Sequence, residues 1–159
     1  DLLKSQINNY TFLGDFRYYL RLGETVSLAH RTMGIINDGK NIYRYYIGGS
    51  WHLRGYRRTE IYGKKFILFN TELRFPIAQA LALHFRNGAL GLAPVRGALF
   101  VDVGNAWDRK FPGFIGSFGV GFRAPLMGAL VLRLDVGRKT DFKTIDNDTF
   151  VQFLFGWNF

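Results

Sequence analysis

The chain has 159 residues, enough for one domain with its own hydrophobic core. Aromatic residues make up 17% of it, Phe alone occupies 16 positions, and the formal net charge is +9. The lack of Cys excludes disulfides, cysteine-ligated zinc and thiol chemistry. The basic residues form no helix-like face that would predict a nucleic-acid partner, and no apolar run reaches the roughly 20 residues of a membrane-spanning helix.

Alternation of apolar and polar residues, which is typical of β-strands, recurs along the chain without a helical period of useful length. In the first such segment Phe12, Phe16 and Leu20 share one face, and Asp15 and Arg17 share the other. The alternating segments are residues 10–22, 25–37, 65–77, 97–107, 117–126, 130–138 and 149–159. We therefore predict an all-β, antiparallel protein with about seven to eight strands in this chain.

The connections between the predicted strands alternate in length. The turns after the first and fifth strands are short, whereas residues 38–64, 108–116 and 137–148 are long and polar. Short turns at one end and long loops at the other are typical of membrane barrels. Residues 78–96 are the exception on the short-turn side, and we interpret them as an interfacial excursion with a short helix.

The strands are one-sided, and two barrel types explain this. A soluble barrel or sandwich turns its apolar face inward, whereas a transmembrane barrel turns it to lipid and encloses a polar lumen. Strand lengths of about 9–11 residues or slightly more, aromatic residues at strand ends, and opposite charges on neighbouring polar faces favour the transmembrane β-barrel. A soluble barrel that binds an apolar ligand remains the alternative.

The strand count bears on completeness. Seven strands are an odd number, whereas bacterial barrels usually have an even one. The sequence begins at Asp1 and not at Met, so we expect either a mature protein or a fragment of a longer one. Either residues 1–8 belong to another strand, or the chain is the C-terminal part of a larger barrel. In either case we expect residues 1–159 to form a single outer-membrane β-barrel domain, with no periplasmic domains in this chain.

Four motifs occur in an order that points to a family. They are "GGSWHLRGY" in the long loop, "NTELRFPI" in the next strand, "ALFVDVGNAW", and "GVGFRAPLMGALVLRLDVG" followed by a terminal "FGWNF". Together they span residues 48–159, and in this order they resemble the C-terminal barrel portion of the BamA/TamA-like outer-membrane assembly superfamily, also called bacterial surface antigen domains.

The resemblance implies that the long loop folds back into the lumen and docks its arginine on the wall. Carried over, Arg54 would meet Asp102, and three wall glycines would leave room for it. The implied loop motif is Gly48, Gly49, Leu53, Arg54, Gly55 and Tyr56, and the implied docking wall is Asp102, Gly104, Gly119, Gly121 and Arg123. A bidentate contact between guanidinium and carboxylate is strong and directional in a confined lumen.

Two further sets of residues follow from the strand faces and the chain end. The polar faces carry the lumenal charges Glu72, Arg74, Arg133 and Asp135. The last strand is similar to the signal that directs outer-membrane insertion, through Phe153, Phe155, Gly156, Trp157 and Phe159. An ordinary amphipathic strand and a solvated Arg54 are the corresponding alternatives.

No pattern in the sequence indicates catalysis, a metal or a cofactor. His30, His52 and His84 are scattered, and Glu72 and Asp102 lack a visible substrate cleft. The resemblance implies a non-enzymatic protein of the bacterial outer membrane that inserts or translocates polypeptides. Its expected partners are outer-membrane lipid, unfolded outer-membrane or secreted polypeptides, and accessory assembly proteins. A passive anchor for a fused enzymatic or propeller module is the alternative role.

Overall fold

The computed structural model describes residues 9–40, 42–78, 81–92, 94–126 and 130–157, which form eleven β-strands. Seven of them build one antiparallel sheet in their order along the chain. These seven are β1 Asn9–Arg21, β2 Ser27–Gly39, β5 Lys65–Ala78, β8 Val95–Trp107, β9 Ile115–Leu126, β10 Leu130–Thr140 and β11 Ile145–Trp157. The prediction of an all-β antiparallel fold is therefore confirmed.

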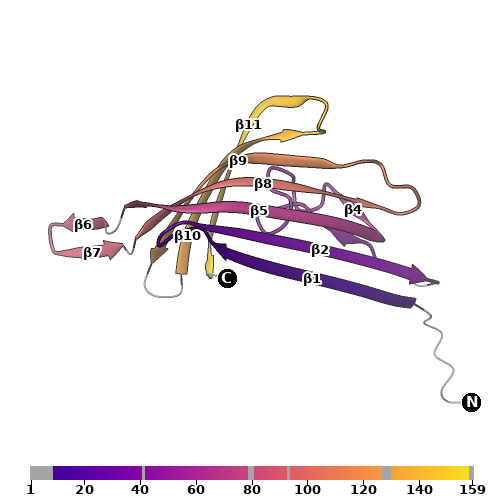
Figure 1. Ribbon diagram of the computed structural model, residues 1–159, viewed down its shortest axis with the longest axis horizontal. Helices are drawn as coiled ribbons and strands as arrows, with labels where there is room; N and C mark the ends of the chain where they lie inside the picture. Colours follow the sequence, from indigo (N-terminus) through magenta and orange to yellow (C-terminus); the bar gives the residue numbers. More distant parts are fainter. Residues whose placement is uncertain (1–8, 41, 79–80, 93, 127–129, 158–159) are drawn as a thin grey trace, which may run out of the picture.

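The sheet is strongly curved and does not close (Figure 1). Strands β1 and β11 form its two edges, and each has one hydrogen-bonded neighbour within the described part of the chain. No helix among the described residues is long and apolar enough to cross a bilayer. The architecture is that of part of a β-barrel, with one concave and one convex face.

The convex face is apolar and exposed, and the concave face holds the charges. Val101, Phe122 and Phe153 are 47%, 43% and 65% exposed, whereas Asp102 and Glu72 are 0% and 6% exposed. A soluble barrel would show the reverse, because its apolar faces would meet in a dry centre. The expected orientation, with lipid-facing apolar residues and a polar interior, is the one that the sheet adopts.

The expectation of a short helix within residues 78–96 is wrong. Strands β6 Leu81–Phe85 and β7 Gly88–Leu92 form an antiparallel hairpin that projects from the end of the main sheet (Figure 1). Leucine and alanine alternate in this segment, and Asn87-Gly88 is a frequent signal of a hairpin turn. The short-turn side therefore carries an extension built from strand structure.

The expected long loop at residues 137–148 is also wrong. β10 continues to Thr140 and β11 begins at Ile145, so four residues make the turn. The Asp141 carboxylate accepts hydrogen bonds from the N–H groups of Lys143 and Thr144, at 2.9 and 2.6 Å. Polar composition suggested a loop here, but strands that project beyond the lipid region are also polar.

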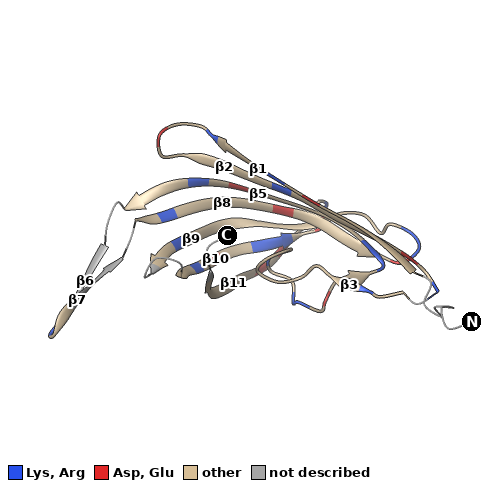
Figure 2. Cartoon of the chain, turned by 90° about the horizontal axis from the view of Figure 1, so that it is seen from below, with Lys and Arg blue, Asp and Glu red and all other residues tan. Residues whose placement is uncertain are grey.

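Charges on the concave face do not simply alternate in sign between neighbouring strands, as the sequence suggested. Arg96 of β8 lies opposite Arg123 of β9, which lies opposite Arg133 of β10. The carboxylates Glu72 and Asp135 lie opposite Phe100 and Gly121. Figure 2 shows the result on β5 and β8, where the basic band lies nearer to the β6–β7 hairpin than the acidic band.

Candidate functional site

Residues 42–64, called the docked loop from here on, fold back across the concave face between β2 and β5 (Figure 1). Two short strands, β3 Tyr45–Tyr46 and β4 Tyr62–Gly63, pair at the base of the loop. The Asn37 side chain on β2 donates to the Tyr43 carbonyl at 2.8 Å. The loop is therefore a folded element attached to the wall of the sheet.

Glycines make the tight path of the loop possible. Gly49 has a positive φ of 99°, and its N–H donates to the carbonyls of Leu53 and Tyr56, at 3.2 and 2.9 Å. A side chain at Gly48 would overlap the backbone of Arg57. Because glycine lacks a Cβ and accepts this backbone conformation, the two residues allow the loop to hold a single compact shape.

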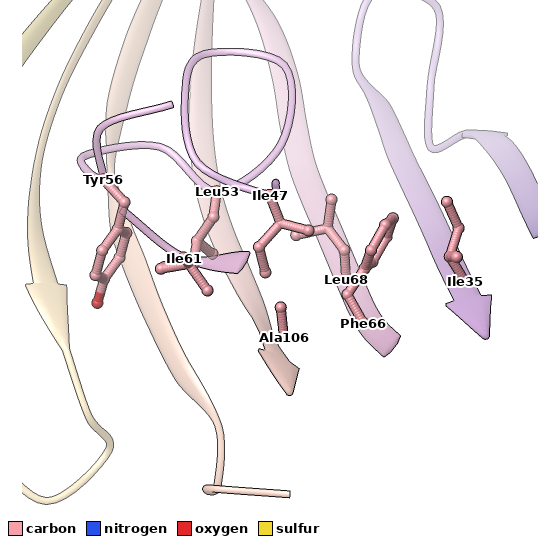
Figure 3. Packing of buried hydrophobic residues seen from close by; sticks show 8 residues of the cluster. All are labelled: Ile35, Ile47, Leu53, Tyr56, Ile61, Phe66, Leu68 and Ala106. Atoms are coloured by element: carbon pink, nitrogen blue, oxygen red, sulfur yellow. The ribbon is translucent and has the colours of Figure 1, made fainter. Parts of the chain in front are cut away.

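Apolar residues attach the loop to the half of the sheet that carries the long loops. Figure 3 shows side chains of the loop lying against side chains of β2, β5 and β8. Both Ile47 and Leu53 are completely buried, as is Leu68 on β5. The cluster consists of Ile35, Ile47, Leu53, Tyr56, Ile61, Phe66, Leu68 and Ala106. It gives the concave face a small hydrophobic core that exists because of the loop.

Arg54 extends from the loop into the centre of the concave wall, where it is 2% exposed. Its Nε and Nη2 donate to the two carboxylate oxygens of Asp102 at 2.5 and 2.6 Å, and its Nη1 donates to Glu72 at 2.6 Å. The guanidinium carbon lies 3.7 Å from the centre of the Phe100 ring. Such bidentate, charge-assisted contacts are among the strongest in proteins, and here they join the loop to β5 and β8.

A wider ionic network surrounds this contact. Arg123 of β9 donates to Glu72 and to Asp135 of β10, both at 2.8 Å. Arg133 donates to Asp135 at 2.6 Å, and Arg74 donates to Glu72 at 2.9 Å. The network therefore joins four adjacent strands around Arg54. Buried charges are costly unless they are paired, so this pairing is what permits seven charged groups, Asp102 included, to lie together in one network.

The three wall glycines differ in what they accommodate. A Cβ at Gly121 would meet the side chains of Arg123 and Asp135, so this glycine adjoins the network. A Cβ at Gly104 or Gly119 would instead meet the backbone of the neighbouring strand, at Ile67 or Val136. The resemblance implied room for Arg54 at all three positions, whereas two of them permit close approach of strands.

Gly55 and Tyr56 complete the contact of the motif with the wall. Gly55 has a φ of 84°, and a Cβ there would lie 2.6 Å from the Phe150 ring. The hydroxyl of Tyr56 donates to the Gly116 carbonyl at 3.2 Å. Burial raises the pKa of Tyr56 to about 12, so its hydroxyl keeps its proton and remains a donor at neutral pH.

The terminal residues lie apart from this site. Phe153 and Phe155 on β11 are 65% and 56% exposed on the convex face, and Gly156 faces the concave side. Trp157 is the last residue of β11, and Phe159 lies outside the described residues. The exposed rings of Phe153 and Phe155 suit contact with lipid, and the expected role of the five residues in membrane insertion stays a prediction.

Three polar side chains hold the loop without having been expected to do so. Asn70 donates to the His52 carbonyl at 2.6 Å and to Asp102 at 2.8 Å. Gln152 of β11 accepts from the Gly55 N–H at 3.2 Å, and Arg31 of β2 donates to the Trp51 carbonyl at 3.1 Å. Asn70 and Gln152 occupy polar faces in the alternation, so a search for amides on those faces would have found them.

The electrostatics of the loop keep Arg54 permanently charged. Burial opposes the charged form of Arg54, but the hydrogen bonds and charge of Asp102 outweigh it and raise the arginine pKa further. Burial, followed by the charges of Arg31 and Arg58, lowers the pKa of His52. Among the described residues no cluster of His, Asp and Glu could hold a metal ion. The arrangement is suited to holding a loop by permanent charge.

Comparison with known proteins assigns the chain to a family. A family model described as the Omp85 superfamily domain matches residues 1–159. The search of curated proteins and the search of solved structures found no match. Since the match covers the whole chain, and since the sheet has the lipid-facing and lumen-facing sides of an outer-membrane barrel, the chain belongs to the Omp85 superfamily, whose members are outer-membrane proteins of polypeptide insertion and transport.

Proposed function

We propose that this chain is the C-terminal part of a larger outer-membrane barrel that inserts or translocates polypeptides, and that the docked loop is its internal brace. The observation that carries the proposal is the burial of Arg54 among carboxylates of three strands, Asp102, Glu72 and Asp135. A loop attached in this way couples the strands of the wall to one another. Its release would loosen them together.

The open sheet supports the larger barrel. In a bilayer, the unpaired backbone groups along β1 and β11 would have no hydrogen-bonding partner, so each edge needs a neighbouring strand. Eight strands enclose only enough space for their own side chains. A barrel that also contains the docked loop has to be wider, which requires strands in addition to these seven.

The proposed chemistry is non-covalent. The described residues of the site bind through ion pairs and apolar contacts, and the charged groups of the network are paired with one another. Changes in the barrel would therefore come from making and breaking these contacts. The expected partners are outer-membrane lipid on the convex face and an unfolded polypeptide on the concave face.

The experiment compares loop docking with activity in the full-length protein reconstituted in liposomes. Arg54→Ala, Asp102→Asn and the double variant are tested for protease cleavage in the loop and for the insertion rate of an unfolded outer-membrane protein. We expect exposed loops and slower insertion in all three variants. The double variant should be no worse than the single ones, because both remove the same contact.

Arg109→Gln serves as the matched control, since Arg109 is an exposed arginine in the connection after β8. It should leave docking and insertion unchanged. Normal insertion by variants whose loops are cleaved would contradict the brace, and would favour a barrel that serves as a passive anchor.

A further inference from the structure

Six arginines, one from each of six adjacent strands, line the half of the concave face that the docked loop leaves open. We call them the arginine belt: Arg17 of β1, Arg31 of β2, Arg74 of β5, Arg96 of β8, Arg123 of β9 and Arg133 of β10. They border a cavity of about 990 Å³, whose other side is formed by residues 50–52 of the loop. The belt lies toward the short-turn end of the sheet (Figure 2).

The strand register places five of these six arginines, all except Arg74, directly opposite another arginine. Arg17 lies opposite Arg31, and Arg123 lies opposite both Arg96 and Arg133. Like charges in directly opposite positions repel each other and destabilise a sheet. Asp15 relieves the first pair because it accepts hydrogen bonds from both arginines. At the other end, Arg96 lacks such a bridging carboxylate among the described residues.

The charges of the belt and the loop arginine are not balanced. The belt and Arg54 together hold seven guanidinium groups, and six of these, all except Arg96, contact four carboxylates, those of Asp15, Glu72, Asp102 and Asp135. Seven positive and four negative charges leave three positive charges without a counterpart in the described part of the chain. Each carboxylate already accepts at least two hydrogen bonds, so the surplus is available to an anion from outside.

The free donors gather at one place beside the cavity. Arg74 uses its Nε toward Glu72, and its two Nη groups have no partner among the described residues. Arg96 is exposed, lines the cavity, and lies diagonally across from Arg74, whose direct partner is Ala98. Two guanidinium groups at such diagonal positions suit a planar oxyanion, because each guanidinium can donate two parallel hydrogen bonds to it.

We propose that the arginine belt binds carboxylate-rich segments of the client polypeptide. This inference rests on the proposed function and adds to it the class of segment that is recognised. The belt faces the concave side, away from the apolar face that contacts lipid, so a peptide reaches it more readily than a lipid headgroup. Short turns are on the periplasmic side of such barrels, from which a client arrives, and opposite charge speeds its capture.

The test measures binding of a short dye-labelled peptide of alternating Asp and Ser to the full-length protein in nanodiscs of neutral lipid. An otherwise identical peptide with Asn in place of Asp is the uncharged probe. We expect binding of the Asp peptide that weakens with salt, and no binding of the Asn peptide. Arg96→Gln should weaken binding about tenfold, the effect of losing one charge-assisted contact, and Arg96→Lys should have a smaller effect.

Arg109→Gln also removes one arginine charge, but at a position away from the cavity, and should leave binding unchanged. Equal weakening by Arg96→Gln and Arg109→Gln would overturn the proposal, because binding would then follow net charge alone. Vesicles rich in phosphatidylglycerol are tested as competitors of the peptide. If they displace it, and if their own binding depends on Arg96, the proposal is overturned in favour of a lipid headgroup. Within the described part of the chain no ion pair joins Arg96 to the Arg54 network, although it lies opposite Arg123, so its variant should keep the loop docked, which protease resistance verifies.

The two proposals can fail separately. If Arg54→Ala leaves client insertion unchanged while Arg96→Gln still weakens peptide binding, the brace is wrong and the peptide site stands. If insertion depends on Arg54 but the Asp peptide does not bind, the belt proposal is wrong and the brace stands.

Discussion

The two halves of the concave face are built from the same strands but differ in how they treat charge. In the half under the docked loop, Arg54 is 2% exposed and is held by Asp102, Glu72 and a nearby aromatic ring. In the open half, arginines of neighbouring strands lie opposite one another beside a cavity, and Arg96 is exposed.

The difference shows what burial imposes. A charge that is removed from water needs a partner, so in the covered half the buried Arg54 is held by carboxylates beside an apolar cluster. Water in the open half screens repulsion and tolerates a surplus of positive charge. The covered half is therefore suited to stability, and the open half to binding a mobile anionic partner.

The largest effect should come from removing the main partner of Arg54 in the covered half. Asp102→Asn leaves the Arg54 guanidinium buried without its main counter-charge, which should lower the free energy of unfolding by about 3–5 kcal/mol. Urea unfolding of the full-length protein in detergent measures this. Asp108→Asn, which removes an exposed pair with Arg44, is the control and should have a much smaller effect. Equal effects would contradict the importance of burial.

A smaller loss should follow from changing the backbone of the loop. Gly55→Ala places a Cβ against the Phe150 ring at a φ of 84°, which should cost about 1–3 kcal/mol. Combining it with Phe150→Ala should relieve the clash but not the backbone strain. In a double-mutant cycle, the second change should therefore cost less in the Gly55→Ala background. Additive costs would show that the ring does not confine this residue.

Loss of an arginine in the open half should have the opposite effect on stability. Arg96→Gln removes one member of a like-charged pair with Arg123, so stability should stay constant or rise by up to about 0.5 kcal/mol. The same urea experiment detects this. A clear loss of stability would show that Arg96 is a structural residue and would remove the contrast between the halves.

The smallest effect concerns pH. Burial and nearby arginines lower the pKa of His52 from its ordinary value of 6.5, so the docked loop binds this proton less well than the released loop. The contribution to docking is complete above pH 6.5 and is lost as the pH falls through the lowered pKa. Protease cleavage in the loop should rise slightly below pH 6.5, and His52→Gln should abolish that rise. If the rise in cleavage persists in His52→Gln, a titrating group other than His52 is responsible for it.

Much of the fold followed from local pattern. The alternation in segments such as residues 65–77 predicts a strand and which side chains share a face, because side chains of a strand point alternately to its two sides. The alternation also placed Asp102 on the polar face of its strand and Val101 on the apolar face. Residues 78–96 were misassigned because their short apolar runs carry no clear period, and turn residues alone had to decide between a helix and a hairpin.

The amino-acid sequence by itself determined the seven strands of the main sheet and their apolar faces. The family resemblance, and not the pattern of residues, implied the pairing of Arg54 with Asp102. Only the tertiary structure decided that Glu72, Asn70 and Gln152 join that contact, and that arginines from six strands lie in one belt. Strand faces repeat every two residues and are therefore local. Which residues meet across strands depends on register, and a shift of one residue would reverse every face.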